Sequence, residues 1–230
     1  MKRSKMIFPA LLMALPLVGC SVSIGGEIEE SWENSGDGAE AKAAYQEFFL
    51  ETYNTEHMKV TTVNPSGDSM IEEIDGTSEY RKDFSNNQLN FETWLFVEEN
   101  KYYVAYHDIE EEDKYYLIDK DTYDGDYKDF ADCFMEVRDE DDTEFEYVEK
   151  GIKKTKDGVS TGTGSMTFIT RDDGDYVKIE ATTDGAKMLE ATVTMYFSED
   201  QSTDVYRYTF DYKANFTFAK PDLNGFTLDR

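Results

Sequence analysis

The sequence predicts an α+β fold: a curved antiparallel β-sheet, shaped as an incomplete barrel, with an N-terminal helix and a mid-chain helix packed on its concave face. Three observations support this prediction. Apolar residues recur at helical spacing after residue 40, most of the chain after residue 55 alternates with a period of two, and residues 127–137 return to helical spacing. One-sided alternation is typical of antiparallel strands that have one face on the core and one face in water.

The N-terminal helix is predicted from a capping signal and an apolar stripe. Asp37 and Glu40 have the spacing of a capping box. The apolar residues that follow lie at i, i+3, i+4, i+7, i+8 and i+12: Ala41, Ala44, Tyr45, Phe48, Phe49 and Tyr53. A stripe of this kind indicates a helix face that packs on the core, and a ligand-facing role is compatible with it.

The clearest strands lie near the C-terminus. Residues 205–218 alternate aromatic with polar side chains, and residues 188–198 alternate apolar with mostly polar ones. Both segments exceed the usual strand length of about five or six residues. Because such long strands seldom stay flat, we expect the sheet to curl.

Turn signals separate the other expected strands, as in NPSGD at residues 64–68 and RDDGD at residues 171–175. Between these signals we expect strands at residues 58–63, 77–84, 89–98, 101–107, 114–119, 145–152, 164–170 and 176–183. The middle of residues 89–98 is apolar on both faces, so this strand is predicted to be covered on both sides. The order is that of a meander of about ten strands.

The mid-chain helix is predicted from a second apolar stripe. Its members are Tyr127, Phe130, Ala131, Phe134 and Val137, with Cys133 at the flank. An acidic run at residues 138–146 follows and closes this insertion.

The N-terminus has the layout of a secretory signal peptide. Lys2, Arg3 and Lys5 precede an apolar stretch of 13 residues at 6–18. This stretch is too short to cross a bilayer, which needs about 20 residues. Residues 17–20 (LVGC) resemble the lipobox of bacterial lipoproteins. That resemblance implies that the Cys20 thiol receives diacylglycerol, that residues 1–19 are removed, and that a further acyl group such as palmitate is added to the Cys20 amine in many species.

Several expectations follow from the lipobox. The chain is divided into a signal peptide (1–19), a lipidated flexible tether (20–36) and a single β-rich domain (37–230). Two or three acyl chains are enough for stable anchoring, so we expect the protein at the cell membrane, facing the extracytoplasmic side. The alternative is a plain export signal that happens to contain a cysteine. After lipidation only Cys133 keeps a free thiol, so an intrachain disulfide is excluded and Cys133 is expected to be buried.

The charge limits the partners. The chain has 23 basic and 50 acidic residues, a formal charge of −27. Removal of residues 1–19 deletes three basic residues and no acid, so the mature charge is 20 minus 50, or −30. The sequence has no basic patch that could neutralise phosphates, so nucleic acid is excluded as a partner. An anionic lipid surface would repel the folded part.

No motif in the sequence indicates catalysis, and we predict a protein that is not an enzyme and has no cofactor or bound metal. Neither His57 nor His107 has zinc-ligand spacing, and G-x-S-x-G, phosphate-loop and H-E-x-x-H motifs are absent from the sequence. Weak calcium binding is an alternative, because residues 119–129 and 139–142 are rich in aspartate. In residues 119–129, however, Gly125 falls one place late for an EF-hand loop.

The order of these elements resembles the LolA/LppX-like lipoprotein architecture. The resemblance rests on the lipobox, acidic tether, first helix, long meander, helical insertion and C-terminal strands, which end in YTFDYKANFTFAKPDL, and it covers most of residues 39–222. It implies a hollow between sheet and helices that carries a lipid or another apolar molecule. No diagnostic residue motif of those families is found here.

From this layout we predict that an apolar ligand or lipid binds in a pocket between sheet and helices. The first helix would line the pocket with Tyr45, Phe48 and Phe49, and residues 89–98 would line it with Trp94 and Phe96. The alternative is a cell-surface protein–protein interaction module with a solid core, which would use its exposed tyrosines for contact. A hydrolase is a third class, but no site for it is visible.

Overall fold

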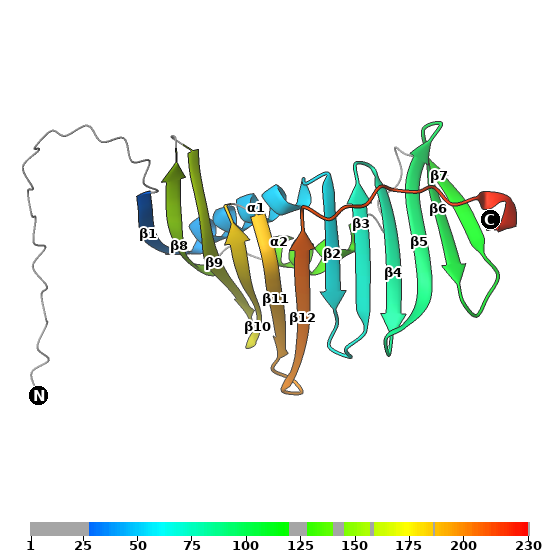
Figure 1. The fold of residues 1–230 in the computed structure, drawn as a ribbon. Helices are drawn as coiled ribbons and strands as arrows, with labels where there is room; N and C mark the ends of the chain where they lie inside the picture. The colour runs from blue at the N-terminus through cyan, green and yellow to red at the C-terminus, as the bar shows by residue number, and fades with distance from the viewer. Residues whose placement is uncertain (1–27, 120–127, 140–144, 157–158, 186, 230) are drawn as a thin grey trace, which may run out of the picture.

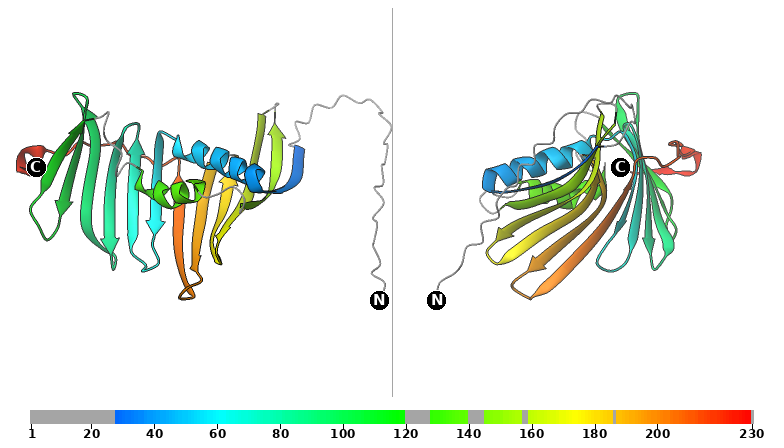
Figure 2. Two further views of the ribbon diagram at one scale, coloured as in Figure 1. Left: turned by 180° about the vertical axis from the view of Figure 1, so that it is seen from behind. Right: turned by 60° about the vertical axis from the view of Figure 1, so that its left-hand side comes forward.

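The structure is a computed structural model that describes residues 28–119, 128–139, 145–156, 159–185 and 187–229. The described residues form a sheet of 13 strands that does not close into a barrel, and two α-helices lie on one of its faces (Figures 1 and 2). Cys20, Tyr127 and residues 140–142 lie outside the described part. Among the described residues, no helix has the length and apolar character needed to cross a membrane.

The sheet has two arms that meet at the β12–β2 pair. The first arm contains, in spatial order, β1 (Ile28–Asp37), β8 (Glu146–Lys156), β9 (Val159–Asp172), β10 (Asp175–Asp184), β11 (Lys187–Phe197) and β12 (Ser202–Asp211). The second arm contains β2 (His57–Val63), β3 (Ser69–Asp75), β4 (Ser78–Ser85), β5 (Gln88–Glu98), β6 (Lys101–Asp108), β7 (Lys114–Asp119) and β13 (Thr227–Leu228). Neighbouring strands are antiparallel except β7 and β13, which are parallel, so the sheet is mixed rather than purely antiparallel.

Two-residue turns close several hairpins. Asn86 and Asn87 between β4 and β5 have φ values of 53° and 63°, and Glu99 and Asn100 between β5 and β6 have values of 49° and 63°. Positive φ at both central positions is the geometry that matches the twist of paired strands, and asparagine tolerates it well.

Both helices lie on chain crossovers that pass over the first arm. Helix α1 (Gly38–Tyr53) leads from β1 at the sheet edge to β2 in the middle of the sheet. The 3₁₀ helix η1 (Asp129–Ala131) and helix α2 (Asp132–Asp139) lie on the return from β7 to β8. The two crossovers use the same face of the sheet, and the helices therefore cover the first arm (Figure 2).

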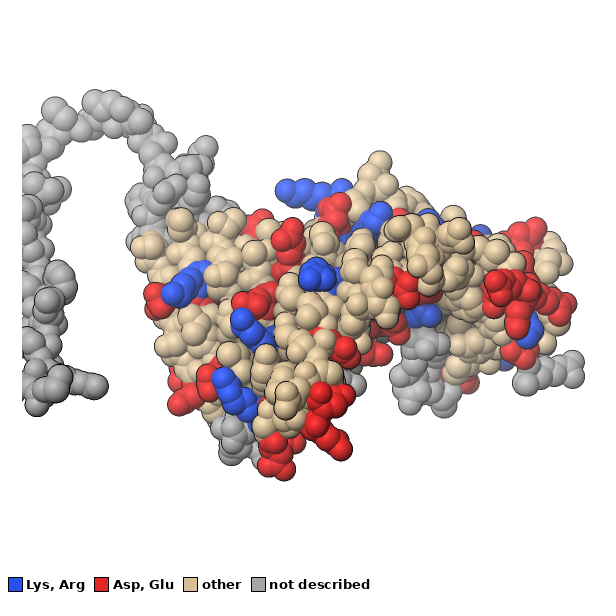
Figure 3. Space-filling view, turned by 90° about the horizontal axis from the view of Figure 1, so that it is seen from below, with Lys and Arg blue, Asp and Glu red and all other residues tan. Residues whose placement is uncertain are grey.

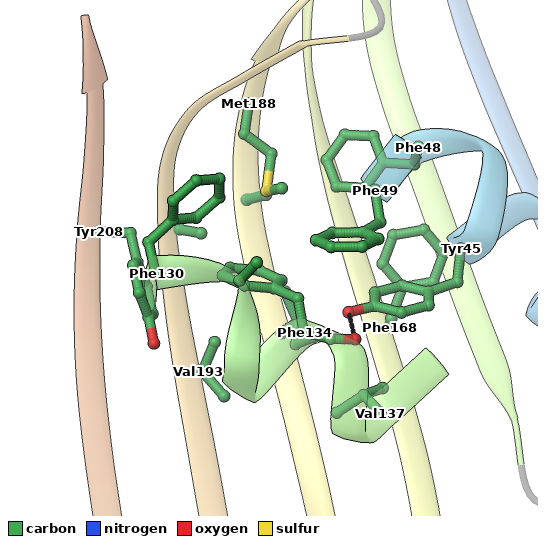
Figure 4. Close-up of a cluster of buried hydrophobic side chains, with 14 of the residues drawn as sticks. Tyr45, Phe48, Phe49, Phe130, Phe134, Val137, Phe168, Met188, Val193 and Tyr208 are labelled. Carbon is green, nitrogen blue, oxygen red and sulfur yellow. Dashed lines mark hydrogen bonds between the residues drawn. The ribbon is translucent and has the colours of Figure 1, made fainter. Parts of the chain in front are cut away.

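Aromatic side chains fill the space between the helices and the first arm (Figure 4). Tyr45 and Phe49 of α1 have no exposed surface, and Phe49 stacks on Phe134 of α2 with ring centroids 5.9 Å apart. The edge of Tyr45 meets Phe168 of β9 at 5.0 Å, and its hydroxyl donates a hydrogen bond to the Phe134 carbonyl at 2.9 Å. This region is a solid core in which even the tyrosine hydroxyl has a partner.

The C-terminal segment, residues 212–226, covers the opposite face of the second arm (Figure 1). Phe216 stacks on His57 of β2 at 4.3 Å, and Phe218 lies 6.1 Å from Phe96 of β5. Further along, Phe226 meets Trp94 edge-on at 6.2 Å. The segment ends in the short 3₁₀ helix η3 (Leu223–Gly225) and β13.

The strand expected at residues 205–218 is only partly present. β12 ends at Asp211, and the chain then leaves the sheet. Its alternation continues because the segment lies flat against a sheet face, so that Phe216 and Phe218 meet that face as they would in a strand. A period of two therefore does not distinguish a strand within a sheet from an extended segment that lies across one.

Three strands were not expected from the sequence: β1, β3 and the two-residue β13. Residues 69–75 form β3, whose pattern is broken by Glu72 on the buried side. Residues 28–36, expected as part of a flexible tether, lie in β1, which pairs with β8 along its whole length. Trp32 of β1 packs over Gly151 of β8, where no larger side chain would fit beneath the indole ring.

Helix α1 begins at Gly38, which has φ of +58°, and Asp37 is its N-cap residue. The capping box expected from Asp37 and Glu40 is not formed, because the Asp37 side chain makes no capping hydrogen bond. The Gly38 amide instead donates to the Phe145 carbonyl at 2.8 Å, which ties the start of α1 to the chain just before β8.

Candidate ligand-binding site

A pocket of about 430 Å³ lies where the two arms meet, between the sheet and the start of the helical insertion. Its lining comes from strands β2, β3, β4, β5 and β12 with the adjoining turns, and from η1 and α2. The lining residues are Thr62, Asn64, Asp68, Ser69, Met70, Asp83, Phe84, Ser85, Asn90, Asp129, Phe130, Asp132, Cys133, Tyr206 and Tyr208. The size is within the range of small-molecule sites, about 300–1,000 Å³.

Residues 128–130, which we call the roof of this pocket, are attached to the sheet by two buried carboxyl groups. The Phe130 amide of η1 donates to both oxygens of Glu72 on β3, each at 3.1 Å. The Lys128 amide donates to Glu79 Oε2 on β4 at 2.7 Å. Lys128 has a left-handed backbone with φ of 58°, and its ammonium group donates to the carbonyls of Tyr53, the last residue of α1, and of Thr55 just after it. The roof is therefore tied to both the sheet and the first helix.

Burial makes these carboxyl groups weak acids. Glu72 and Glu79 have no exposed surface. Burial raises the pKa of Glu79 to about 7, although the Lys128 amide and Arg81 oppose the rise. Burial, together with the neighbouring Glu79, also raises the pKa of Glu72 well above its usual value. The pair therefore retains a proton at pH values where exposed glutamates are ionised. Because no surface of either side chain is exposed, we assign them to holding the roof rather than to acid–base catalysis.

Carboxylates also surround the pocket itself. Asp68, Asp83, Asp129 and Asp132 line it, and the described residues that form the lining include no Lys or Arg. Arg81 lies nearby and pairs with Asp83 at 3.4 Å and with Asp129 at 3.5 Å. The lining therefore holds four carboxylates, two of which pair with Arg81. In the view from below, acidic side chains are more abundant than Lys and Arg on this face of the molecule (Figure 3).

Thr62 of β2 is an unsatisfied polar group in the pocket wall. Its side chain is buried, with 8% of the residue exposed, and its hydroxyl oxygen has no hydrogen-bond partner. Thr62 lies opposite Tyr208 in the β2–β12 register, on the side of the sheet that faces the helices. A buried hydroxyl without a partner costs about 1–3 kcal/mol, so a ligand that supplied one would offset that cost.

The side chains predicted to bind the ligand fall into two groups on opposite faces of the sheet. Tyr45, Phe48 and Phe49 belong to the solid core beneath α1. Trp94 and Phe96 face the C-terminal segment instead. None of the five lines the pocket described above.

The two histidines lie on the second arm, away from the pocket. His57 Nδ1 lies 3.5 Å from Asp75, and its Nε2 lies 3.1 Å from the Ala214 carbonyl. His107 Nδ1 lies 3.1 Å from Glu92. Each ring thus has partners that fix its orientation in the fold.

Cys133, expected to be buried, is half-buried and lines the pocket. Most of the aspartate-rich segment 119–129 and residues 140–142 lie outside the described part. Within the described part, no group of three or more His, Cys, Asp or Glu side chains is arranged to hold a metal ion.

Sequence reasoning missed the pocket because its lining comes from separate parts of the chain. Turn signals flank β3 on both sides, NPSGD at residues 64–68 and DG at residues 75–76. They were the only local indication that a strand containing Glu72 lies between them. Nothing local indicates that Thr62, Asp83 and Tyr206 lie around one cavity.

No protein-family model, no curated protein and no solved structure matches this chain.

Proposed function

We propose that this chain is a bacterial lipoprotein, anchored through Cys20 on the extracytoplasmic side of the cell membrane, whose folded part binds a small molecule and catalyses no reaction. The ligand would occupy the pocket beneath η1 and the start of α2. We further interpret the sheet as an incomplete barrel with both helices on its concave side, which places the pocket at the edge of the helix-filled hollow.

The observation that carries this proposal is the 430 Å³ pocket and the chemistry of its wall. Apolar atoms, those of the half-buried Met70, Phe84 and Tyr206 among them, provide most of the surface that a ligand would bury. Nine of the 15 lining residues are nevertheless polar or acidic, so the wall is more polar than that of most small-molecule sites. The core beneath α1 has no comparable space, because aromatic rings fill it. We therefore expect the apolar part of a ligand in the pocket rather than between α1 and the sheet.

A pocket-blocking variant tests binding. Asn90 is exposed at the pocket margin, so Asn90→Trp adds bulk there without burying a polar group. Gln88→Trp makes the same change two residues away on β5, where the residue is exposed and outside the pocket lining. Native mass spectrometry of the full chain in a neutral detergent should detect a bound small molecule in the parent and in Gln88→Trp, but not in Asn90→Trp. A free protein mass for all three would contradict the proposal.

The anchor is tested separately by the two cysteines. Cys20→Ala should abolish labelling by a palmitate analogue and release the protein from membranes, because acylation requires the Cys20 thiol. Cys133→Ala is the control and should leave both properties unchanged. Membrane retention of Cys20→Ala, or loss of the label in Cys133→Ala, would contradict the lipobox interpretation.

A protein-binding module is the second candidate, and exposed apolar residues on the first arm favour it. Val148 and Ile152 of β8 are 37% and 44% exposed, and they lie on the face that no described helix covers. Substitution of both by threonine should abolish capture of a surface partner if this face is used. The same substitution should leave the bound small molecule unchanged if the pocket is the functional site.

A further inference from the structure

We propose that the ligand of this pocket carries a positive charge and that it is a small organic ammonium ion with an apolar or aromatic body. This inference rests on the proposed function and adds the chemical class of the ligand. Three independent features of the wall support it: its carboxylates, its aromatic rings and the Thr62 hydroxyl.

The electrostatics favour a cation. Asp68 and Asp132 lie in the lining together with Asp83 and Asp129, and the charge of Arg81 is shared between the latter two. An anionic ligand would meet four carboxylates and no Lys or Arg in the described lining. A cationic ligand would be attracted to the same carboxylates, and opposite charges in a partly buried site interact more strongly than in water.

Aromatic rings select an organic cation over a bare ion. Half-buried Tyr206 of β12 and Phe84 of β4 line the same pocket as the carboxylates, whereas Phe130 and Tyr208, also in the lining, belong to the core. The faces of aromatic rings attract ammonium groups, and they bury the carbon atoms attached to them. The carboxylates do not converge as metal ligands do, since no three acidic side chains of the described residues form a metal-binding group.

The Thr62 hydroxyl can accept a hydrogen bond from a donor on the ligand. Its oxygen is buried without a partner in the pocket wall. A protonated primary amine has three N–H donors and no acceptor. One donor can be accepted by Thr62 and the others by carboxylates such as Asp68, whose half-buried side chain already accepts from Ser85 Oγ at 2.8 Å. An ammonium group would thus give the Thr62 hydroxyl a hydrogen-bond partner, and each of its own N–H donors would find an acceptor.

Matched probes test the charge directly. Phenethylamine, phenethyl alcohol and hydrocinnamate share a phenylethyl body and differ in an ammonium, hydroxyl or carboxylate end. Isothermal titration of the full chain in a neutral detergent should show binding of phenethylamine, at least tenfold weaker binding of the alcohol, and no binding of hydrocinnamate. A further titration with dihexanoyl phosphatidylethanolamine distinguishes a lipid amine from a free one. Tighter binding of this lipid than of phenethylamine would place the ammonium group on a lipid.

Two variants tie the binding to the site. Thr62→Val removes the unpartnered hydroxyl, and Asp68→Asn removes one charge but keeps an acceptor oxygen. Each should weaken phenethylamine binding roughly tenfold, the size expected for one hydrogen bond to a charged group. Asp184→Asn makes the same charge change at an exposed residue outside the pocket and should have no effect.

The outcomes separate this inference from the proposed function. Equal binding of the alcohol or of hydrocinnamate, or displacement of phenethylamine by calcium chloride at matched ionic strength, would overturn the ammonium inference. Absence of binding by every amine probe would overturn it as well. In each case the proposed function would still stand if the mass of a bound small molecule were lost only in Asn90→Trp.

Discussion

The two arms of the sheet are covered by different elements on different faces. In the first arm, α1 and α2 cover one face with stacked aromatic rings such as Phe49 and Phe134. In the second arm, the C-terminal segment covers the other face with isolated aromatic contacts, among them Phe218 on Phe96. The helix side of the second arm carries Glu72, Glu79 and Arg81 next to the core residues Met58, Val60 and Ile74 of β2 and β3. The covering elements therefore change from one face of the sheet to the other along its length. The pocket lies where this change occurs, at the β12–β2 pair.

The largest expected difference between the arms is in the cost of losing an aromatic ring. Phe49→Ala in the first arm removes a fully buried ring and should lower the free energy of unfolding by about 3–5 kcal/mol. Phe218→Ala in the second arm removes a half-buried ring and should cost less than half as much. Chemical denaturation of the two variants measures both costs. Equal losses in the free energy of unfolding would contradict the distinction between a solid core in the first arm and a surface cover on the second.

The next effect is the pH dependence of the second arm. The folded protein binds protons more tightly than the unfolded chain at Glu72 and Glu79, because their pKa values are raised. Their contribution to stability is therefore greatest below about pH 4.5 and falls as the pH rises toward 7. For Glu79 the loss amounts to about 3 kcal/mol, from a shift of about two and a half pKa units.

Glu79→Gln tests this pH dependence, since the amide keeps an acceptor oxygen for Lys128 but does not ionise. Above pH 7 the variant should be more stable than the parent, and the difference should vanish at low pH. Glu73→Gln, on the next residue of β3 from Glu72, is the control and should not change the slope. An unchanged slope in Glu79→Gln would show that the buried pair does not set the pH response.

The smallest effect concerns Thr62, at the junction of the arms. Thr62→Val replaces an unpartnered hydroxyl by a methyl group of similar size, so the ligand-free protein should gain about 1 kcal/mol of stability, the low end of the cost of a buried hydroxyl without a partner. Thermal unfolding of the ligand-free full chain measures this gain. A clear loss of stability would mean that the hydroxyl has a partner within the fold.

The sequence predicted most strands of both arms, but it missed β1 in the first arm and β3 and β13 in the second. The stripe from Ala41 to Tyr53 corresponds to residues of α1, because regular burial leaves a regular pattern. β3 was missed because Glu72 occupies a core position, and hydrophobic patterning places carboxylates outside. The segment at residues 212–218 was misassigned because a chain that lies across a sheet alternates as a strand does. The pocket depends on how β2, β4, β12 and η1 meet, which no local pattern encodes.

The central claim is that ligand binding occurs where the two arms meet rather than in the aromatic core. The methionine methyl groups test this most directly, because Met70 lines the pocket while Met58 and Met188 lie in the core. In a methyl-labelled full chain titrated with phenethylamine, the Met70 resonance should shift with saturation and the other two should stay in place. Shifts at Met58 and Met188 with none at Met70 would contradict the account and place the ligand beneath α1.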